Sequence, residues 1–189
     1  MPVQALIDHF NTITPLSPAA QAALKQCLYL EHYPKKTIIQ QQHRPAQHIF
    51  MVHTGLVRSY YTHNNKEITA SFGTPGCMVC AMSSLLSYEP AAYSIETLEE
   101  SELFFLEFAL LEALYDAHHD LERLGRMMIT QYYLDQEKEL KAIRFQSSEQ
   151  RYQTLLNTQP ELLQRAPLGH VASYLGITAE TLSRLRARY

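Results

Sequence analysis

The sequence has few of the residues that mark a secreted, disulfide-bonded or membrane-spanning protein. It contains no Trp and three Cys in 189 residues, and an odd number of cysteines argues against a disulfide framework. No apolar run approaches the ~18 residues of a membrane-spanning helix, and no signal peptide is visible. We therefore expect a soluble protein of the reducing cytoplasm, with no membrane partner.

Charge is also scarce, and it is unevenly distributed. Charged residues make up 19% of the chain, and the formal net charge is −3, which taken alone argues against a nucleic-acid partner. Residues 165–189, however, hold four arginines against one glutamate, whereas residues 1–164 hold 12 basic and 18 acidic side chains. The C-terminal end is therefore the part that could bind a polyanion.

The stretch from Pro167 to Arg188 has the pattern of two short helices joined by a tight turn. Gly176 can adopt the positive φ that the turn requires, and Thr178 can cap the second helix. Apolar residues at helical spacing form the inner faces: Val171, Ala172, Leu175, Leu182 and Leu185. This pattern predicts a helix-turn-helix, a motif that places its second helix in the major groove of DNA.

The second of these helices carries polar side chains opposite its apolar face. A glutamate can accept a hydrogen bond from cytosine N4, an arginine can bind guanine through O6 and N7, and a serine or threonine can contact base or phosphate. Arg186 and Arg188 are predicted phosphate contacts. The predicted DNA-binding residues are Thr178, Glu180, Thr181, Ser183, Arg184, Arg186 and Arg188. The alternative is a solvated helical hairpin with ordinary surface charges.

The N-terminal part reads as two helices followed by a β domain. Val3 to Phe10 is predicted to be helical, and Ser17-Pro18 opens a second helix that ends near Leu28. Short β-type runs separated by turn signals then suggest an antiparallel barrel or roll. These runs are Thr37–Gln40, Ile49–His53, Leu56–Tyr61, Ile68–Phe72, Tyr93–Leu98 and Glu102–Glu107.

A long helical pattern runs from Leu110 to about Phe145. Leu121, Leu124 and Met128 recur at a spacing of three to four, which suits a helix that pairs with a copy of itself. The alternative is a core helix that lies on the roll. A further helix is expected over Glu149–Asn157, and Gln159-Pro160 closes it.

The expected fold class is therefore α+β. It consists of an N-terminal antiparallel β-roll, a long dimerisation helix and a C-terminal all-α helix-turn-helix domain without a wing. We assign residues 1–115 to the helices and sensory roll, 116–145 to the dimerisation helix and 146–189 to the DNA-binding domain.

This order of elements resembles the Crp/Fnr family of transcription regulators over nearly the whole chain. Ala46 to Val57 looks like the family's strand-turn-strand entry into its cyclic-nucleotide-binding roll, and Lys66 to Gly76 looks like the next hairpin. The segment from Leu175 to Arg184 resembles the Fnr-like recognition segment. In that branch Glu, Ser and Arg at the positions of Glu180, Ser183 and Arg184 contact bases.

The resemblance implies a homodimeric, sequence-specific regulator that binds double-stranded DNA, with no enzymatic activity and no cofactor. RNA polymerase and an unidentified small-molecule effector are candidate partners. Cyclic AMP is not the expected effector. Where cyclic-AMP-binding members hold a Gly-Glu pair and an Arg-Ser pair, this sequence has Cys80-Ala81 and Ala91-Ala92. No basic residue lies between Lys66 and Arg123 to pair with a buried phosphate.

The sequence ends at Tyr189, directly after the recognition helix, so the β-hairpin wing of many members is not expected. More of the affinity for DNA should then come from the helices and from dimerisation.

Two other groups of residues compete for a function. Cys77 and Cys80 are a candidate redox pair, although the sequence favours thiols that pack as small apolar residues. Several histidines in the roll suggest a cupin-type metalloprotein, but none forms a close pair followed by glutamate, so we expect no metal site and no catalytic residue. The competing function is a small-molecule- or metal-binding β-roll protein whose C-terminal helices do not bind DNA.

Overall fold

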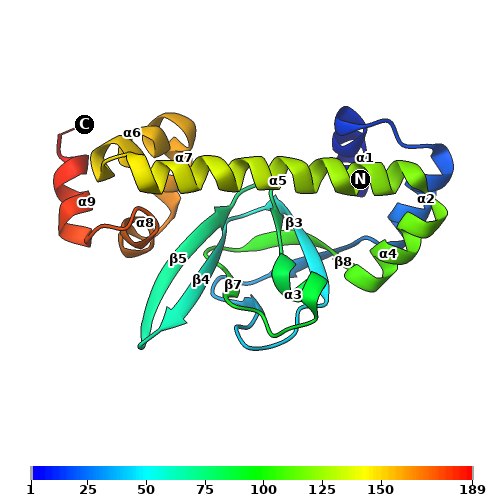
Figure 1. Ribbon diagram of the computed structural model, residues 1–189, viewed down its shortest axis with the longest axis horizontal. Coiled ribbons are helices and arrows are strands. Elements are labelled where there is room, and N and C mark those ends of the chain that lie inside the picture. Colours follow the sequence, from blue (N-terminus) through cyan, green and yellow to red (C-terminus); the bar gives the residue numbers. More distant parts are fainter. Residues whose placement is uncertain (1, 189) are drawn as a thin grey trace.

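The computed structural model describes residues 2–188 and places a β-roll beside one long helix, with helices clustered at both ends (Figure 1). The helices are α1 (Pro2–Ile13), α2 (Pro18–Cys27), α3 (Met82–Ser87), α4 (Phe108–Ala117), α5 (His119–Phe145), α6 (Ser148–Thr158), α7 (Pro160–Arg165), α8 (Leu168–Tyr174) and α9 (Ala179–Arg186). The strands are β1 (Tyr29–Tyr33), β2 (Ile38–Gln40), β3 (His48–Thr54), β4 (Val57–His63), β5 (Lys66–Gly73), β6 (Met78–Val79), β7 (Ser94–Thr97) and β8 (Ser101–Glu107). Within residues 2–188, no helix has both the length and the apolar character that crossing a membrane requires.

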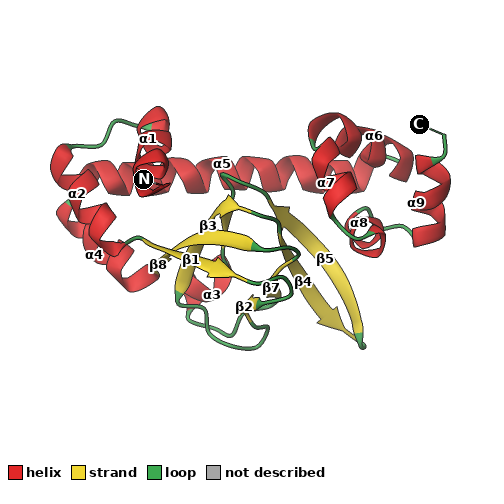
Figure 2. Cartoon of the chain, turned by 180° about the vertical axis from the view of Figure 1, so that it is seen from behind, coloured by secondary structure: helices red, strands yellow, loops and turns green. Residues whose placement is uncertain are grey.

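The roll consists of two four-stranded antiparallel sheets, with strand orders β1-β8-β3-β6 and β2-β7-β4-β5 (Figure 2). The β4–β5 hairpin is long, and its register runs from Val57 opposite Gly73 to His63 opposite Lys66. Apolar side chains from both sheets form the core between them: Phe50, Val52, Val57, Val79, Ile95 and Leu103. The predicted α+β class with an antiparallel roll is confirmed.

The predicted continuous helix from Leu110 to Phe145 is wrong in one respect, because the chain breaks it at His118. This residue is extended, with φ −139° and ψ 96°, and it separates α4 from α5. Helix α4 then folds back on α5, and Tyr115 lies against Gly125. A Cβ on Gly125 would lie 2.2 Å from the Tyr115 hydroxyl oxygen, so glycine is what allows this close approach.

The first turns of α5 belong to the core of the chain itself. Leu121 is 1% exposed and Leu124 is 5% exposed, and both pack with α1, α2 and the roll in a cluster that includes Ile7, Phe10 and Phe104. Met128 is half-buried against the same cluster. The prediction that these three residues form a dimer seam is therefore corrected for the two leucines, whose side chains their own chain already covers.

The C-terminal helices pack around a second core. Ser147 caps α6 in a capping box with Gln150, and Pro160 opens the short helix α7 where the sequence predicts only a stop. The core contains Tyr152, Leu162, Val171, Leu175, Leu182 and Leu185, together with Leu56 and Leu98 from the roll. The roll therefore contributes side chains to the interior of the helix-turn-helix region.

Candidate nucleic-acid interface

Helices α8 and α9 form the helix-turn-helix that the sequence predicts. Gly176 has φ +65°, and the Ile177 N–H donates to the Ala172 carbonyl at 2.9 Å, which closes the turn. The Thr178 hydroxyl accepts a hydrogen bond from the Thr181 N–H at 3.2 Å and caps α9. With Val171 and Leu182 fully buried, the orientation of α9 is fixed by the packing of both helices.

The face of α9 opposite its buried leucines is polar and accessible. Glu180, Ser183, Arg184 and Arg188 are exposed, and Thr181 is half-buried. Hydrogen bonds from its own backbone N–H and from the Thr178 hydroxyl lower the pKa of the Glu180 carboxyl, so this group is an anion at neutral pH. Arg184 donates to the Thr181 hydroxyl at 3.3 Å. This face can therefore offer a carboxylate, a hydroxyl and a guanidinium to base edges.

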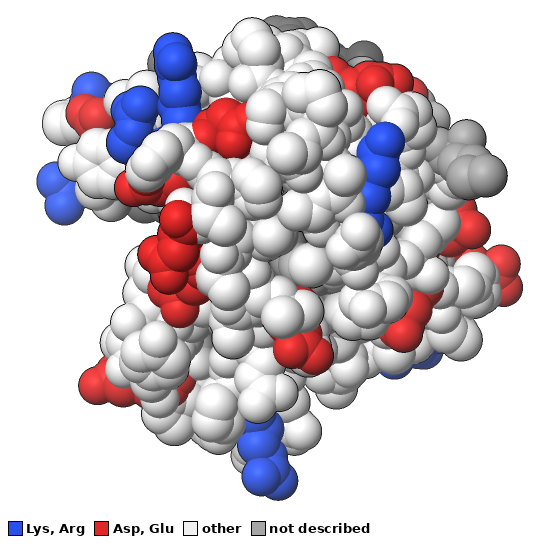
Figure 3. Space-filling model, turned by 90° about the vertical axis from the view of Figure 1, so that its right-hand side faces the viewer, with Lys and Arg blue, Asp and Glu red and all other residues white. Residues whose placement is uncertain are grey.

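The position of α9 in the molecule suits binding to a large partner. It lies at the end opposite α1 and α2, away from the roll (Figure 1). The other end has acidic and basic side chains scattered over a mostly uncharged surface, without a continuous basic patch on the face that Figure 3 shows.

Arg186 has a partner inside the chain. Its guanidinium donates a hydrogen bond to the Leu163 carbonyl of α7, so it links α9 to α7. Arg188 lies beyond the end of α9 and is exposed. Of the two predicted phosphate contacts, Arg188 is the one whose side chain makes no hydrogen bond or ion pair within residues 2–188.

The roll is nearly filled beside Cys80 and Tyr93. A cavity of about 60 Å³ lies there, lined by Ser59, Ser71, Phe72, Cys80, Tyr93 and Tyr132 among others. The Tyr93 hydroxyl donates to the Cys80 carbonyl at 2.7 Å, and Ala81 and Ala91 are buried. Ligand pockets usually measure roughly 300–1,000 Å³, and among the described residues no Lys or Arg lines this one.

The two closely spaced cysteines are free thiols. Burial raises the pKa of Cys80 to about 12, so at neutral pH almost none of it is thiolate, the nucleophilic form. Cys77 lies 3.5 Å from the Thr74 hydroxyl. This environment does not favour rapid thiol exchange at Cys80, and the redox pair stays a prediction.

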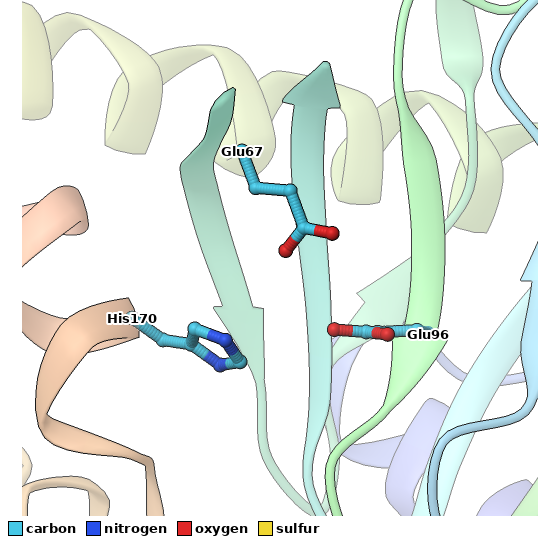
Figure 4. Close-up of side chains that lie close together, drawn as sticks. All are labelled: Glu67, Glu96 and His170. Atoms are coloured by element: carbon cyan, nitrogen blue, oxygen red, sulfur yellow. The ribbon is translucent and has the colours of Figure 1, made fainter. Parts of the chain in front are cut away.

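Sequence reasoning missed a charged cluster between the roll and α8. Arg58, which is 2% exposed, forms ion pairs with Glu67 and Glu96, and His170 of α8 faces the two carboxylates (Figure 4). Burial and the nearby Arg58 guanidinium lower the pKa of His170. Next to it, the Thr69 N–H of β5 donates to the Ser173 hydroxyl at 3.0 Å. No spacing in the sequence signals this cluster, because its members come from β4, β5, β7 and α8.

Comparison with known proteins finds a match over the β-roll and similar structures over most of the chain. Residues 30–118 match the family model of the cyclic nucleotide-binding domain. FixK2 from Bradyrhizobium japonicum is similar in structure, with 22% identity, coverage of 85% of this chain and 83% of that chain, and a TM-score of 0.69.

The c-di-GMP responsive global regulator CLP from Xanthomonas campestris has 18% identity, 91% coverage of both chains and a TM-score of 0.70. A protein from Eubacterium rectale assigned to the Crp/Fnr family has 17% identity, coverage of 92% of this chain and 83% of that chain, and a TM-score of 0.71. No curated protein matches the sequence. Residues 30–118 therefore match the cyclic nucleotide-binding domain, and the chain has the fold of these Crp/Fnr-type structures.

Proposed function

We propose that this protein is a sequence-specific DNA-binding transcription regulator of the Crp/Fnr type. The observation that carries the proposal is the polar face of α9, on which Glu180, Ser183 and Arg184 are exposed while Leu182 and Leu185 are buried. A capped helix of this kind enters the major groove with its N-terminal turns against the bases. Glutamate and arginine can there distinguish cytosine and guanine.

A homodimer is part of the proposal, with its interface on the second half of α5. Ile129, Tyr133, Leu140 and Ile143 are 41%, 66%, 47% and 60% exposed, and together with Gln136 they follow the alternating four-and-three spacing of a heptad. Pairing this face with its copy would bury it and place two α9 helices on successive turns of DNA. The leucines of the first turns of α5 then support the helix rather than the interface.

The effector, if the roll binds one, is proposed to be something other than cyclic AMP. The small cavity beside Tyr93 has neither the volume nor the cation that a cyclic nucleotide requires. Double-stranded DNA and a second copy of the chain are the partners that we propose.

The test compares two arginines of the interface on selected and random DNA. A binding site is first selected from random duplexes, and dissociation constants are then measured by gel shift. Arg184→Ala should weaken binding to the selected site about 5- to 150-fold and leave random DNA nearly unaffected, because a bidentate arginine–guanine pair contributes ~1–3 kcal/mol of discrimination. Arg44→Ala, which removes an exposed arginine of the roll, is the matched control.

Two further variants separate base contacts from backbone contacts. Arg188→Ala should lower the affinity for all sequences together and reduce the salt dependence by about one unit of slope. Glu180→Ala should relax the choice of base at one position. Equal losses on selected and random DNA for Arg184→Ala would remove the argument for sequence-specific reading.

A further inference from the structure

Three side chains with metal-binding atoms meet where the helix-turn-helix contacts the roll. Glu67 comes from β5, Glu96 from β7 and His170 from α8, and one ligand atom of each lies within 4.8 Å of the others. Figure 4 shows the three side chains pointing toward one another across the gap between the strands and the helix. The cluster therefore joins the sensory roll to the DNA-binding helices.

Arg58 contacts only one oxygen of each of the two carboxylates. It contacts Oε2 of Glu67 and Oε1 of Glu96, and among residues 2–188 no hydrogen bond is recorded to the second oxygen of either carboxylate. Two carboxylates and one guanidinium leave the cluster with a net charge of −1 when the imidazole is neutral. A cation is therefore attracted to the side of the cluster that His170 faces.

His170 supplies an independent indication of a missing partner. Its Nδ1 atom is buried and has no hydrogen-bond partner among the described residues. A buried polar atom without a partner loses free energy relative to water, and a metal ion or a proton donor would compensate for that loss.

We propose that Glu67, Glu96 and His170 bind a divalent transition-metal ion of the zinc type. Two carboxylate oxygens and one imidazole nitrogen suit Zn²⁺ with a water in the fourth position, whereas the nitrogen ligand disfavours Mg²⁺ and Ca²⁺. The bound ion links α8 to β5 and β7 and stabilises the docked helix-turn-helix. As a consequence that rests on the proposed function, the ion acts as an effector of DNA binding.

Binding of the ion is tested without DNA. Full-length protein is treated with a chelator, dialysed and titrated with ZnCl₂ by calorimetry, and Co²⁺ absorption reports nitrogen ligation. We expect one equivalent per chain at micromolar concentration or below, and at least tenfold weaker binding for Glu67→Gln and for His170→Gln. Glu67 is half-exposed, so its substitution keeps the fold, which circular dichroism verifies. His119→Gln, which changes an imidazole whose side chain is 97% exposed, is the matched control and should bind normally.

Two results overturn the site. One is the absence of zinc binding to the wild-type chain at zinc concentrations up to about 1 mM, which is far above the dissociation constant of a protein zinc site. The other is wild-type binding by both Glu67→Gln and His170→Gln, which would place the ion elsewhere.

The effector role is tested separately by gel shift on the selected DNA site, with zinc and with chelator. We expect zinc to change the affinity of the wild-type chain at least threefold and that of His170→Gln not at all. Equal affinities with and without zinc would refute the effector role. DNA binding without zinc binding refutes the metal site alone, and zinc binding by a chain that binds no DNA refutes the proposed function alone.

Discussion

Replacement of Arg58 by methionine should strongly destabilise the fold, because it removes the cation that two carboxylates share. Methionine keeps the aliphatic stem of the side chain but removes the guanidinium, whose carbon lies 4.1 Å from the Tyr60 ring centroid. Removing one partner of a buried ion pair costs ~3–5 kcal/mol. Glu67 has 49% of its side chain exposed and Glu96 only 15%. We therefore assign the loss of stability to the unpaired carboxylate of Glu96 alone. The expected loss is about 3 kcal/mol, or roughly a hundredfold in the folding equilibrium.

The assay is urea unfolding of the full chain, followed by circular dichroism at about pH 7.5 and about pH 5. Without Arg58 the largely buried carboxylate of Glu96 loses the cation that it pairs with, and it is left as an uncompensated anion at neutral pH. The loss in the free energy of unfolding should therefore become smaller toward acid pH. Arg58→Met combined with Glu96→Gln should recover most of the loss at neutral pH. A loss in the free energy of unfolding below about 1 kcal/mol at pH 7.5 would refute the reasoning. So would a double variant that is no more stable than Arg58→Met.

Three shorter predictions concern α5 and the roll. Ile143→Glu should convert the proposed dimer to a monomer in sedimentation, whereas Ile38→Glu, on an exposed strand of the roll, should not; a dimeric Ile143→Glu variant would exclude this face of α5. Gly125→Ala should lower the free energy of unfolding by about 1–3 kcal/mol, because Tyr115 must move to admit a methyl group, and unchanged urea unfolding would contradict this. Calorimetry with cyclic AMP should show no binding at micromolar concentration, and a measurable affinity there would mean that the cavity beside Tyr93 opens.

Much of the fold could be predicted because its signals are local. Gly55 and Gly76 have positive φ at turns that the sequence marks, and apolar residues between such turns indicate strands. Strand β1 (Tyr29–Tyr33) was not predicted, because its partner β8 lies about 70 positions away and its outward side chains are polar. The break at His118 has no proline or glycine to mark it. It depends on the packing of α4 against α5, which only the folded chain provides.

In the candidate site too, features set by local residues could be predicted, and those set by long-range packing could not. The cap at Thr178 and the turn at Gly176 are set by neighbouring residues, so helix α9 could be predicted from the sequence. Spacing on α5 identifies apolar residues but does not say which of them the chain covers itself, and Leu124 was therefore assigned to the wrong surface. The meeting of Glu96 and His170 depends on how α8 docks on the roll, which no local pattern encodes.

Leu56 and Leu98 extend from the roll into the core of the C-terminal helices, and this limits how the protein can be divided. Arg165 of α7 reinforces the join, since it donates to the Gly55 carbonyl at 2.8 Å and pairs with Glu99. A fragment that begins at residue 146 would expose an unfilled apolar surface. A chimera that transfers the C-terminal helices to another protein would therefore have to carry both loops of the roll with it, and the exchangeable module is discontinuous in sequence.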